Sequence, residues 1–172
     1  AFSPDGKSVA FVSRRFPDAE RSPDYNLFVA EVAKPGVAPR QLTKYEGADN
    51  DPGAGSYPAW SPDGSHIAYI RTGDPELIWY AVNSLAVVPS NGGEERVVTA
   101  TLDRNVSQPF WSTDGSAINF LVEDNGVQRL DSVPAKGGKV KNVAGGERII
   151  FAPTVSENGR VALLGADPTS PV

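Results

Sequence analysis

Apolar and polar positions alternate along the chain in short segments, and four of the apolar segments follow nearly the same four residues. Ser-Pro-Asp-Gly stands at 3–6 and 61–64, Ser-Thr-Asp-Gly at 112–115 and Ser-Glu-Asn-Gly at 156–159. An apolar run follows each copy, at 8–12, 66–70, 117–121 and 161–164. Short runs that are rich in β-branched and aromatic residues are typical of buried β-strands. The pattern therefore predicts four strands that begin just after four similar turns.

The repeated residues have the chemistry of a hairpin turn. Proline presets φ at the second position, aspartate follows, and glycine supplies the left-handed conformation that closes the turn. An apolar residue precedes each turn: Phe2, Trp60, Trp111 and Val155. We therefore expect a β-hairpin around each copy, built on a type I turn followed by a glycine bulge.

Further apolar runs fill the segments between the turns. Strands are expected at 26–32, 39–43, 77–82, 85–89, 95–99, 127–133 and 140–143. Gly-Gly pairs at 92–93 and 137–138 separate the last two runs of a unit and indicate hairpins there. No segment has a pattern that predicts a helix.

The spacing of the turns indicates a β-propeller. Their glycines, Gly6, Gly64, Gly115 and Gly159, follow one another at intervals of 58, 51 and 44 residues. Four short strands in a unit of this length are typical of a propeller blade. The predicted fold is all-β, with four-stranded antiparallel blades in a partial ring of about three and a half blades. The expected blades are 1–56, 57–107 and 108–151, with the first hairpin of a further blade at 152–172, and the polar stretches 14–24 and 45–55 are loop insertions.

Composition and charge narrow the classes of function. The net charge is −5 and the Lys and Arg residues form no dense cluster, which argues against nucleic acid or an anionic membrane surface as a partner. No apolar run approaches the length of a membrane span. The chain has no Cys, which excludes disulfides and thiolate metal sites, and the residues do not distinguish a cytoplasmic from a periplasmic location. The chain also has no Met and opens inside a repeat, so we expect it to be a fragment of a longer protein.

The repeat resembles that of two known groups of propellers. Pro58-Ala59-Trp60-Ser61-Pro62-Asp63-Gly64, followed by Ile67-Ala68-Tyr69 and later by Gly92-Gly93-Glu94 and Arg96-Val97-Val98-Thr99, carries the resemblance. It is similar to the N-terminal propeller of the prolyl oligopeptidase family of serine peptidases, which includes dipeptidyl and acylaminoacyl peptidases. It is also similar to the periplasmic TolB-like propellers. The long polar insertions look more like those of the peptidases.

The resemblance to the peptidases implies a supporting role for this segment. In that family the propeller caps a hydrolase domain of the same chain and admits only short peptides to the active site. The family's nucleophile lies in a Gly-x-Ser-x-Gly turn between a strand and a helix. The chain's single Gly-x-Ser, Gly6-Lys7-Ser8, has Ala10 in place of the second glycine. The alternative is a non-catalytic TolB-like propeller that binds protein partners in the periplasm, and a weaker one is a propeller lyase or lactonase.

Individual candidates for chemistry each have a structural interpretation as well. His66 is the only histidine, so it has no second imidazole with which to form a metal site or a catalytic pair. The stretch Glu46–Asp51 offers carboxylates for Ca²⁺ but lacks the alternate spacing of a calcium loop, which favours a solvated loop. The turn aspartates directly precede glycine, whereas a sialidase-type Asp-box has one residue between them. We therefore assign no catalytic, cofactor-binding or metal-ligating residue and expect no cofactor.

Aromatic residues and exposed faces suggest contacts rather than catalysis. Trp60 and Trp111 recur at one position of the repeat, which favours packing between blades, whereas Trp79 and Tyr80 lie outside that position and suit a contact at the rim. A partial ring leaves apolar sheet faces open. The expected partners are thus the hydrolase domain of the parent chain, a short peptide, and a second copy through the open faces.

Overall fold

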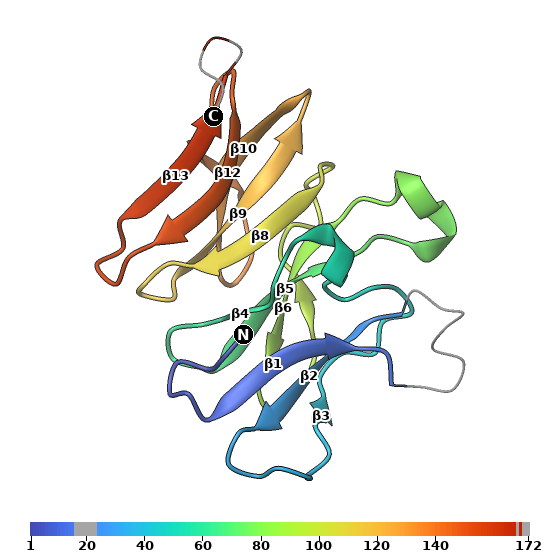
Figure 1. Ribbon diagram of the computed structural model, residues 1–172. Coiled ribbons are helices and arrows are strands. Elements are labelled where there is room, and N and C mark those ends of the chain that lie inside the picture. The colour runs from blue at the N-terminus through green and yellow to red at the C-terminus, as the bar shows by residue number, and fades with distance from the viewer. Residues whose placement is uncertain (16–23, 168, 170–172) are drawn as a thin grey trace.

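The computed structural model describes residues 1–15, 24–167 and 169, which form sheets that follow one another in chain order (Figure 1). The first sheet has the order β1-β2-β3 and consists of Ser8–Ser13, Asn26–Glu31 and Arg40–Gln41. All its pairs are antiparallel. Phe2 adds an isolated bridge to Val9, so the residues before the first turn lie beside β1.

The second sheet shows the complete pattern of four antiparallel strands. Its order is β4-β5-β6-β7, formed by Ala59–Trp60, His66–Arg71, Ser84–Pro89 and Arg96–Val97. The first turn of the unit joins β4 to β5 and the Gly-Gly segment joins β6 to β7. Alternate residues of β5 face the first sheet and the third sheet, because side chains point to opposite faces along a strand.

The third sheet contains one further unit and a hairpin. β8 (Val106–Trp111), β9 (Ala117–Asp124), β10 (Val127–Pro134) and β11 (Lys141–Ala144) repeat the antiparallel pattern. β12 (Ile149–Val155) and β13 (Val161–Ala166) form the hairpin around the fourth turn. A single parallel pair, Gln128 with Ile149, joins this hairpin to β10.

One expected strand is wrong. Residues 77–82 do not form a strand: Pro75–Tyr80 is the 3-10 helix η2. Asp74 begins it, because its side chain accepts a hydrogen bond from the Glu76 N–H at 2.9 Å and its carbonyl accepts one from the Leu77 N–H at 3.0 Å. A second 3-10 helix, η1 (Pro52–Ala54), lies in the expected insertion at 45–55. Most of the other insertion, 14–24, lies outside the described residues.

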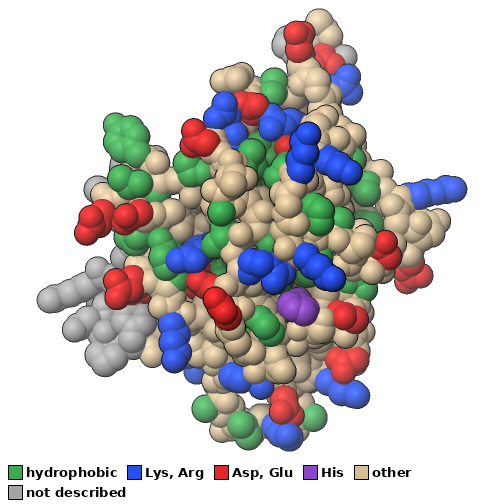
Figure 2. All heavy atoms as spheres, turned by 180° about the vertical axis from the view of Figure 1, so that it is seen from behind, with side chains coloured by type: hydrophobic (Ala, Val, Ile, Leu, Met, Phe, Trp, Pro, Cys, Tyr) green, Lys and Arg blue, Asp and Glu red, His purple; other side chains and the backbone are tan. Residues whose placement is uncertain are grey.

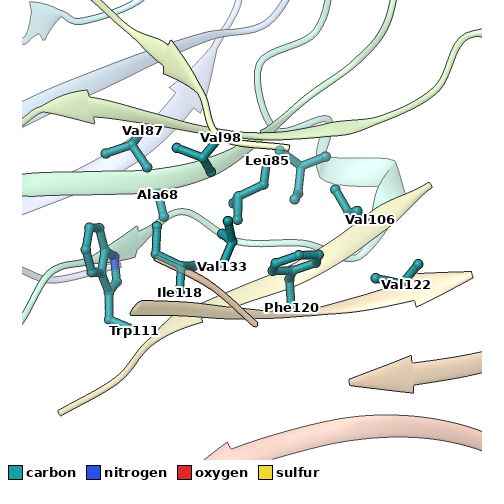
Figure 3. Packing of buried hydrophobic residues seen from close by; sticks show 11 residues of the cluster. Ala68, Leu85, Val87, Val98, Val106, Trp111, Ile118, Phe120, Val122 and Val133 are labelled. Atoms are coloured by element: carbon teal, nitrogen blue, oxygen red, sulfur yellow. The ribbon is translucent and has the colours of Figure 1, made fainter. Parts of the chain in front are cut away.

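Apolar side chains fill the spaces between neighbouring sheets. One cluster joins the first and second sheets and includes Leu27 and Tyr69, both fully buried. A larger cluster joins the second and third sheets, where Leu85 meets Ile118 and Phe120 (Figure 3). Four-stranded antiparallel units that pack face to face are the architecture of a β-propeller. The all-β partial propeller expected from the sequence is therefore confirmed.

Candidate functional site

The repeated turns lie at the ends of strands, on the same side of each sheet. Each turn is held by the same internal hydrogen bonds. In the second copy the Ser61 hydroxyl donates to Asp63 Oδ1 at 2.6 Å, and Ser61 Oγ accepts the His66 N–H at 2.9 Å. The Ser65 N–H also donates to Asp63 Oδ1, at 3.0 Å. These bonds lower the pKa of Asp63 to about 2, with the Ser61 hydroxyl as the largest cause. Gly64 has a φ of 72°, the left-handed conformation that the turn requires.

The same arrangement recurs in the first, third and fourth copies. Ser3, Ser112 and Ser156 each donate to the acidic or amide side chain two residues later, at 2.7, 2.6 and 2.6 Å. The Ser112 hydroxyl is the largest cause that lowers the pKa of Asp114 to about 2. The turn aspartates are thus engaged within their own turns. They form structural turns and no Asp-box.

Contacts between successive units repeat as well. The indole N–H of Trp60 donates to the Ala1 carbonyl at 3.1 Å, and that of Trp111 donates to the Ala59 carbonyl at 2.9 Å. Each tryptophan therefore ties its own sheet to the preceding one, as the recurrence of the residue indicates. Arginines make the opposite connection, from one sheet to the next. Arg40 donates to the Ser90 carbonyl at 2.6 Å and Arg96 to the Ala135 carbonyl at 2.9 Å.

Two grooves lie between these contacts, one at each junction of sheets. The first groove, between the first and second sheets, has a volume of about 480 Å³ and is lined by Arg40, Trp60 and Asn91 among others. The second groove, between the second and third sheets, has a volume of about 600 Å³. Its lining includes the equivalents of those residues: Arg96, Trp111 and Lys136. The repeat therefore generates two versions of one groove.

His66 lines the second groove and is half-buried at the start of β5. The Ser65 hydroxyl lies 2.7 Å from His66 Nδ1 and 2.8 Å from both carboxylate oxygens of Asp63. A hydroxyl has a single proton, and a carboxylate is the stronger acceptor. Ser65 therefore donates to Asp63 and accepts from Nδ1–H of His66, which leaves Nε2 as the other polar atom of the ring.

A buried carboxylate lies at the junction of the first and second sheets. Asp49 is fully buried, and neither of its side-chain oxygens has a hydrogen-bond partner among the described residues. Burial raises the pKa of Asp49 to about 7, because desolvation disfavours the charged form. Its backbone forms an isolated bridge with Arg71, so the loop is fixed to the edge of the second sheet. The expectation of a solvated loop at 46–51 is wrong for Asp49 and for the adjoining Asn50, which is also buried.

Polar groups close to Asp49 form a chain from the second sheet to the loop that carries Asp49. The Tyr69 hydroxyl donates to Glu95, and the Arg71 guanidinium donates to the other oxygen of Glu95 at 2.8 Å. Arg71 also lies over the ring of Tyr45, 3.7 Å from its centroid. Burial is the main cause that raises the pKa of Tyr69. These groups hold the loop to the sheet and contain no nucleophile with an adjacent base.

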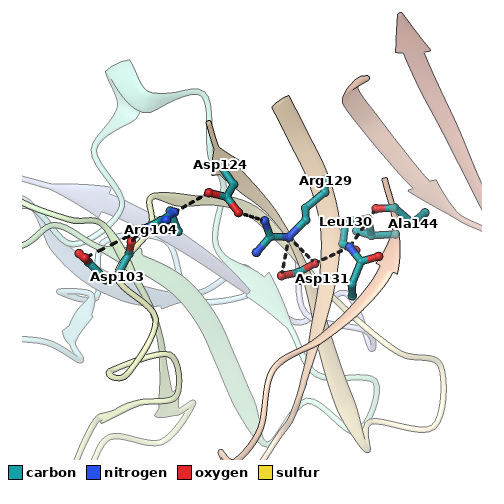
Figure 4. Close-up of polar contacts among 8 residues, drawn as sticks. Asp103, Arg104, Asp124, Arg129, Leu130, Asp131 and Ala144 are labelled. Carbon is teal, nitrogen blue, oxygen red and sulfur yellow. Dashed lines mark hydrogen bonds and ion pairs between the residues drawn. The ribbon is translucent and has the colours of Figure 1, made fainter. Parts of the chain in front are cut away.

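At the other end of the strands of the third sheet, away from the repeated turn, charged residues form a ladder (Figure 4). Asp124 bridges Arg104, at 2.6 Å, and Arg129. Arg129 continues to Asp131 at 3.1 Å, and Asp131 accepts a hydrogen bond from the Asn142 amide at 2.9 Å. Hydrogen bonds from the two arginines lower the pKa of Asp124, with Arg104 as the largest cause. The ladder joins β9, β10 and β11 and leaves none of these carboxylates unpaired.

The remaining expected candidates have structural surroundings. Asp51 accepts a hydrogen bond from the Gly53 N–H at 2.8 Å and so caps η1. Within the described residues no group of three or more His, Asp or Glu side chains is placed to hold a metal ion. Tyr80 is 88% exposed, whereas the side chain of Trp79 lies outside the described part of the structure. Among the described helices none is long and apolar enough to cross a membrane.

Sequence reasoning missed two sets of residues. The buried carboxylate lies in a loop, Tyr69 and Arg71 lie on β5, and Glu95 comes just before β7, so no local pattern links them. The arginines Arg40 and Arg96 did leave a signal, because Arg-x-Leu-Thr at 40–43 and Arg-Val-Val-Thr at 96–99 occupy the same place in successive units. The threonines of these segments, Thr43 and Thr99, each accept a backbone N–H at 2.9 Å from the neighbouring strand of their own sheet.

Solved structures with the same architecture place the chain among the β-propellers. A puromycin-hydrolysing peptidase from Mycobacterium tuberculosis matches with a TM-score of 0.72 at 19% identity, over 96% of this chain and 26% of that one. TolB from Acinetobacter baumannii matches with a TM-score of 0.70 at 17% identity, over 98% of this chain and 37% of that one. At these identities the likeness shows the fold. No protein-family model matches the sequence.

Relatives in sequence specify the type of propeller. Dipeptidyl-peptidase 5 of Trichophyton schoenleinii is 33% identical over 144 residues, which cover 77% of this chain and 19% of the relative. The peptidase YuxL of Bacillus subtilis is 31% identical over 123 residues, which cover 70% of this chain and 16% of the relative. The chain spans less than a fifth of the length of these relatives. The chain is therefore a propeller region of the peptidase family that the repeat resembles, and TolB propellers share its fold.

Proposed function

We propose that this segment is the substrate-gating part of a serine peptidase whose hydrolase domain lies in the same parent chain. The observation that carries the proposal is the similarity to dipeptidyl-peptidase 5 over 77% of this chain. A propeller is a rigid ring of sheets around a channel, and a ring of that kind admits narrow, flexible substrates and excludes folded ones. The substrates are accordingly short peptides.

The segment itself supplies no catalytic group in this proposal. Ser8, the only serine in a Gly-x-Ser sequence, lies at the start of β1 and donates its backbone N–H to Ser3 Oγ at 2.9 Å. The nucleophile of a hydrolase instead occupies a sharp turn from a strand into a helix. The only histidine, His66, contacts Ser65 beside a hairpin turn. The Ser65 hydroxyl in turn contacts Asp63 and so takes part in the structure of the turn.

The proposal is tested on the full-length parent protein with two measurements. Labelling with a fluorophosphonate probe reports an activated serine, and we expect one labelled serine outside residues 1–172. Hydrolysis of an octapeptide is then compared with hydrolysis of a folded protein that contains the same eight residues in an exposed loop. We expect cleavage of the peptide to be faster by at least a hundredfold.

Two results would contradict the proposal in different ways. Equal cleavage of the octapeptide and the folded protein would show that the parent protein is a peptidase but would contradict the gating role of the propeller. Absence of both labelling and hydrolysis would contradict peptidase activity in the parent protein. A non-catalytic propeller that binds protein partners would then be the better account.

A further inference from the structure

The second groove has a basic residue at two positions where the first groove has a neutral one, although the repeat generates both grooves. Ser8 lines the first groove two residues after its turn glycine, and His66 occupies the equivalent position in the second groove. Asn91 lines the first groove after β6, and Lys136 occupies the equivalent position after β10. Both differences replace a neutral residue with a basic one. The second groove is also the larger, at about 600 Å³ against about 480 Å³.

The cations of the second groove are not neutralised by ion pairs. Arg96 donates to the Ala135 carbonyl, and neither Arg96 nor Lys136 lies within ion-pair distance of a carboxylate among the described residues. The two acidic residues of the lining, Asp63 and Asp114, accept hydrogen bonds from their own turns. Seen from behind, the single histidine lies at the surface with basic side chains beside it (Figure 2).

An apolar wall lies next to these cations. Trp111 and Val87 line the second groove and belong to the cluster between the second and third sheets. Trp111 is 8% exposed and its position is fixed by its hydrogen bond to Ala59. A site of this kind combines donors for an anion with a fixed apolar surface for the group attached to it. An arginine and a lysine near one another favour a carboxylate or phosphate through charge-assisted hydrogen bonds.

We propose that the second groove binds the C-terminal carboxylate of a short peptide through Arg96 and Lys136, beside His66, with the last side chain against Trp111. The choice of a peptide rests on the proposed function, because a peptidase meets short peptides as substrates and releases them as products. The groove lies beside the turns, and its wall is formed in part by Trp111 and Val87 of the cluster between the second and third sheets.

The test uses the full-length parent protein after reaction with a serine-directed inhibitor, so that the probe is not cleaved. The probe is a fluorescein-labelled Ala-Ala-Leu tripeptide with a free carboxylate, and its binding is measured by fluorescence anisotropy against the same peptide with a C-terminal amide. We expect the free carboxylate to bind at least tenfold more tightly than the amide. We also expect its affinity to fall when the salt concentration rises, because charged donors hold it.

Variants then locate the site. The double variant His66→Ser with Lys136→Asn gives the second groove, at these two positions, the residues that the first groove already has in the same fold. We expect it to bind the carboxylate peptide at least tenfold more weakly than the wild type. Lys139→Asn is the matched control: it removes an exposed lysine of the same hairpin that does not line the groove, and we expect less than a twofold change.

Equal affinity for the carboxylate and the amide, or an equal loss in the double variant and in Lys139→Asn, would overturn the proposal. Failure of the proposed function is read separately, from hydrolysis before the inhibitor is added. If the parent protein binds the carboxylate peptide through this groove but hydrolyses no peptide, the binding site is supported and the proposed peptidase function is contradicted.

Discussion

The interface between the second and third sheets differs sharply from the surroundings of the last hairpin. The interface buries eleven apolar residues, among them Ile118 and Phe120, which have no exposed surface (Figure 3). The hairpin β12–β13 contributes only Ile150 to a buried cluster. Leu163 and Leu164 of β13 are 37% and 48% exposed. Consecutive strand residues face opposite sides, so β13 is covered on neither face.

Strand pairing does not explain this difference. β12 and β13 are paired from Ile149 with Ala166 to Val155 with Val161, apart from one irregularity. The hairpin thus has its backbone hydrogen bonds and lacks only a neighbouring sheet. In a repeat architecture each unit buries its apolar face against the next unit. The burial of a blade is therefore a property of two successive units, and hydrogen bonding alone does not supply it.

The largest expected effect comes from shortening a side chain in the filled interface. Phe120→Ala removes a fully buried ring and leaves a cavity between two sheets, so we expect it to lower the free energy of unfolding by about 3–5 kcal/mol. Leu164→Ala removes an exposed side chain from the hairpin, and we expect a change within about 0.5 kcal/mol. Urea unfolding, followed by tryptophan fluorescence at fixed protein concentration, measures both. Equal losses would show that the hairpin is covered in solution.

A smaller effect, which depends on pH, is expected at the junction of the first and second sheets. Burial raises the pKa of Asp49 from 3.8 to about 7, so the folded protein holds this proton more tightly than the unfolded chain. The contribution of Asp49 to the free energy of unfolding is then largest below pH 4, and it falls as the pH rises to about 7. The loss is on the order of 2–4 kcal/mol.

Asp49→Asn tests this dependence because it removes the charge and keeps the size of the side chain. We expect the variant to be more stable than the wild type at pH 8, by about 2 kcal/mol, and equally stable near pH 4. Asp51→Asn is the control, since Asp51 caps η1 in the same loop and asparagine caps a helix almost as well. A wild type whose stability does not fall between pH 4 and 7, measured against Asp49→Asn, would contradict the account.

The tryptophans that tie successive sheets together should contribute less. Trp111→Phe keeps an aromatic ring in the filled interface but leaves the Ala59 carbonyl without the indole N–H, and we expect a loss of about 1–2 kcal/mol. Trp60→Phe loses the longer bond to Ala1 at a half-buried position, and we expect about 0.5 kcal/mol. Thermal unfolding of the two variants gives the comparison, and a larger loss at Trp60 would reverse it.

The parts of the fold that the sequence predicts are those fixed by local chemistry. A turn such as Ser61–Gly64 contains its own donors, acceptors and left-handed glycine, so its four residues specify it. Residues 77–82 show the limit: their apolar composition suits a strand, but Asp74-Pro75 begins a 3-10 helix that leaves Tyr80 exposed. The burial of Asp49 depends on strands from two sheets, and the contrast between the grooves depends on pairs such as His66 and Lys136, far apart in the chain. Neither follows from local sequence.

The smallest expected effect on unfolding accompanies a clear effect on association. The open faces of the hairpin lead us to expect that the isolated segment associates with a second copy, because exposed apolar strands are readily covered by another chain. Leu164→Lys places a charge on one of these faces and should shift the segment towards monomer in light scattering. At a concentration low enough for the segment to be monomeric, its free energy of unfolding should change by less than about 0.5 kcal/mol. Val37→Lys is the matched control. Val37 is 64% exposed in the loop between β2 and β3, and the substitution should not change the association. A wild-type segment that stays monomeric at high concentration would contradict the prediction, and an equal effect of both variants would place the contact away from β13.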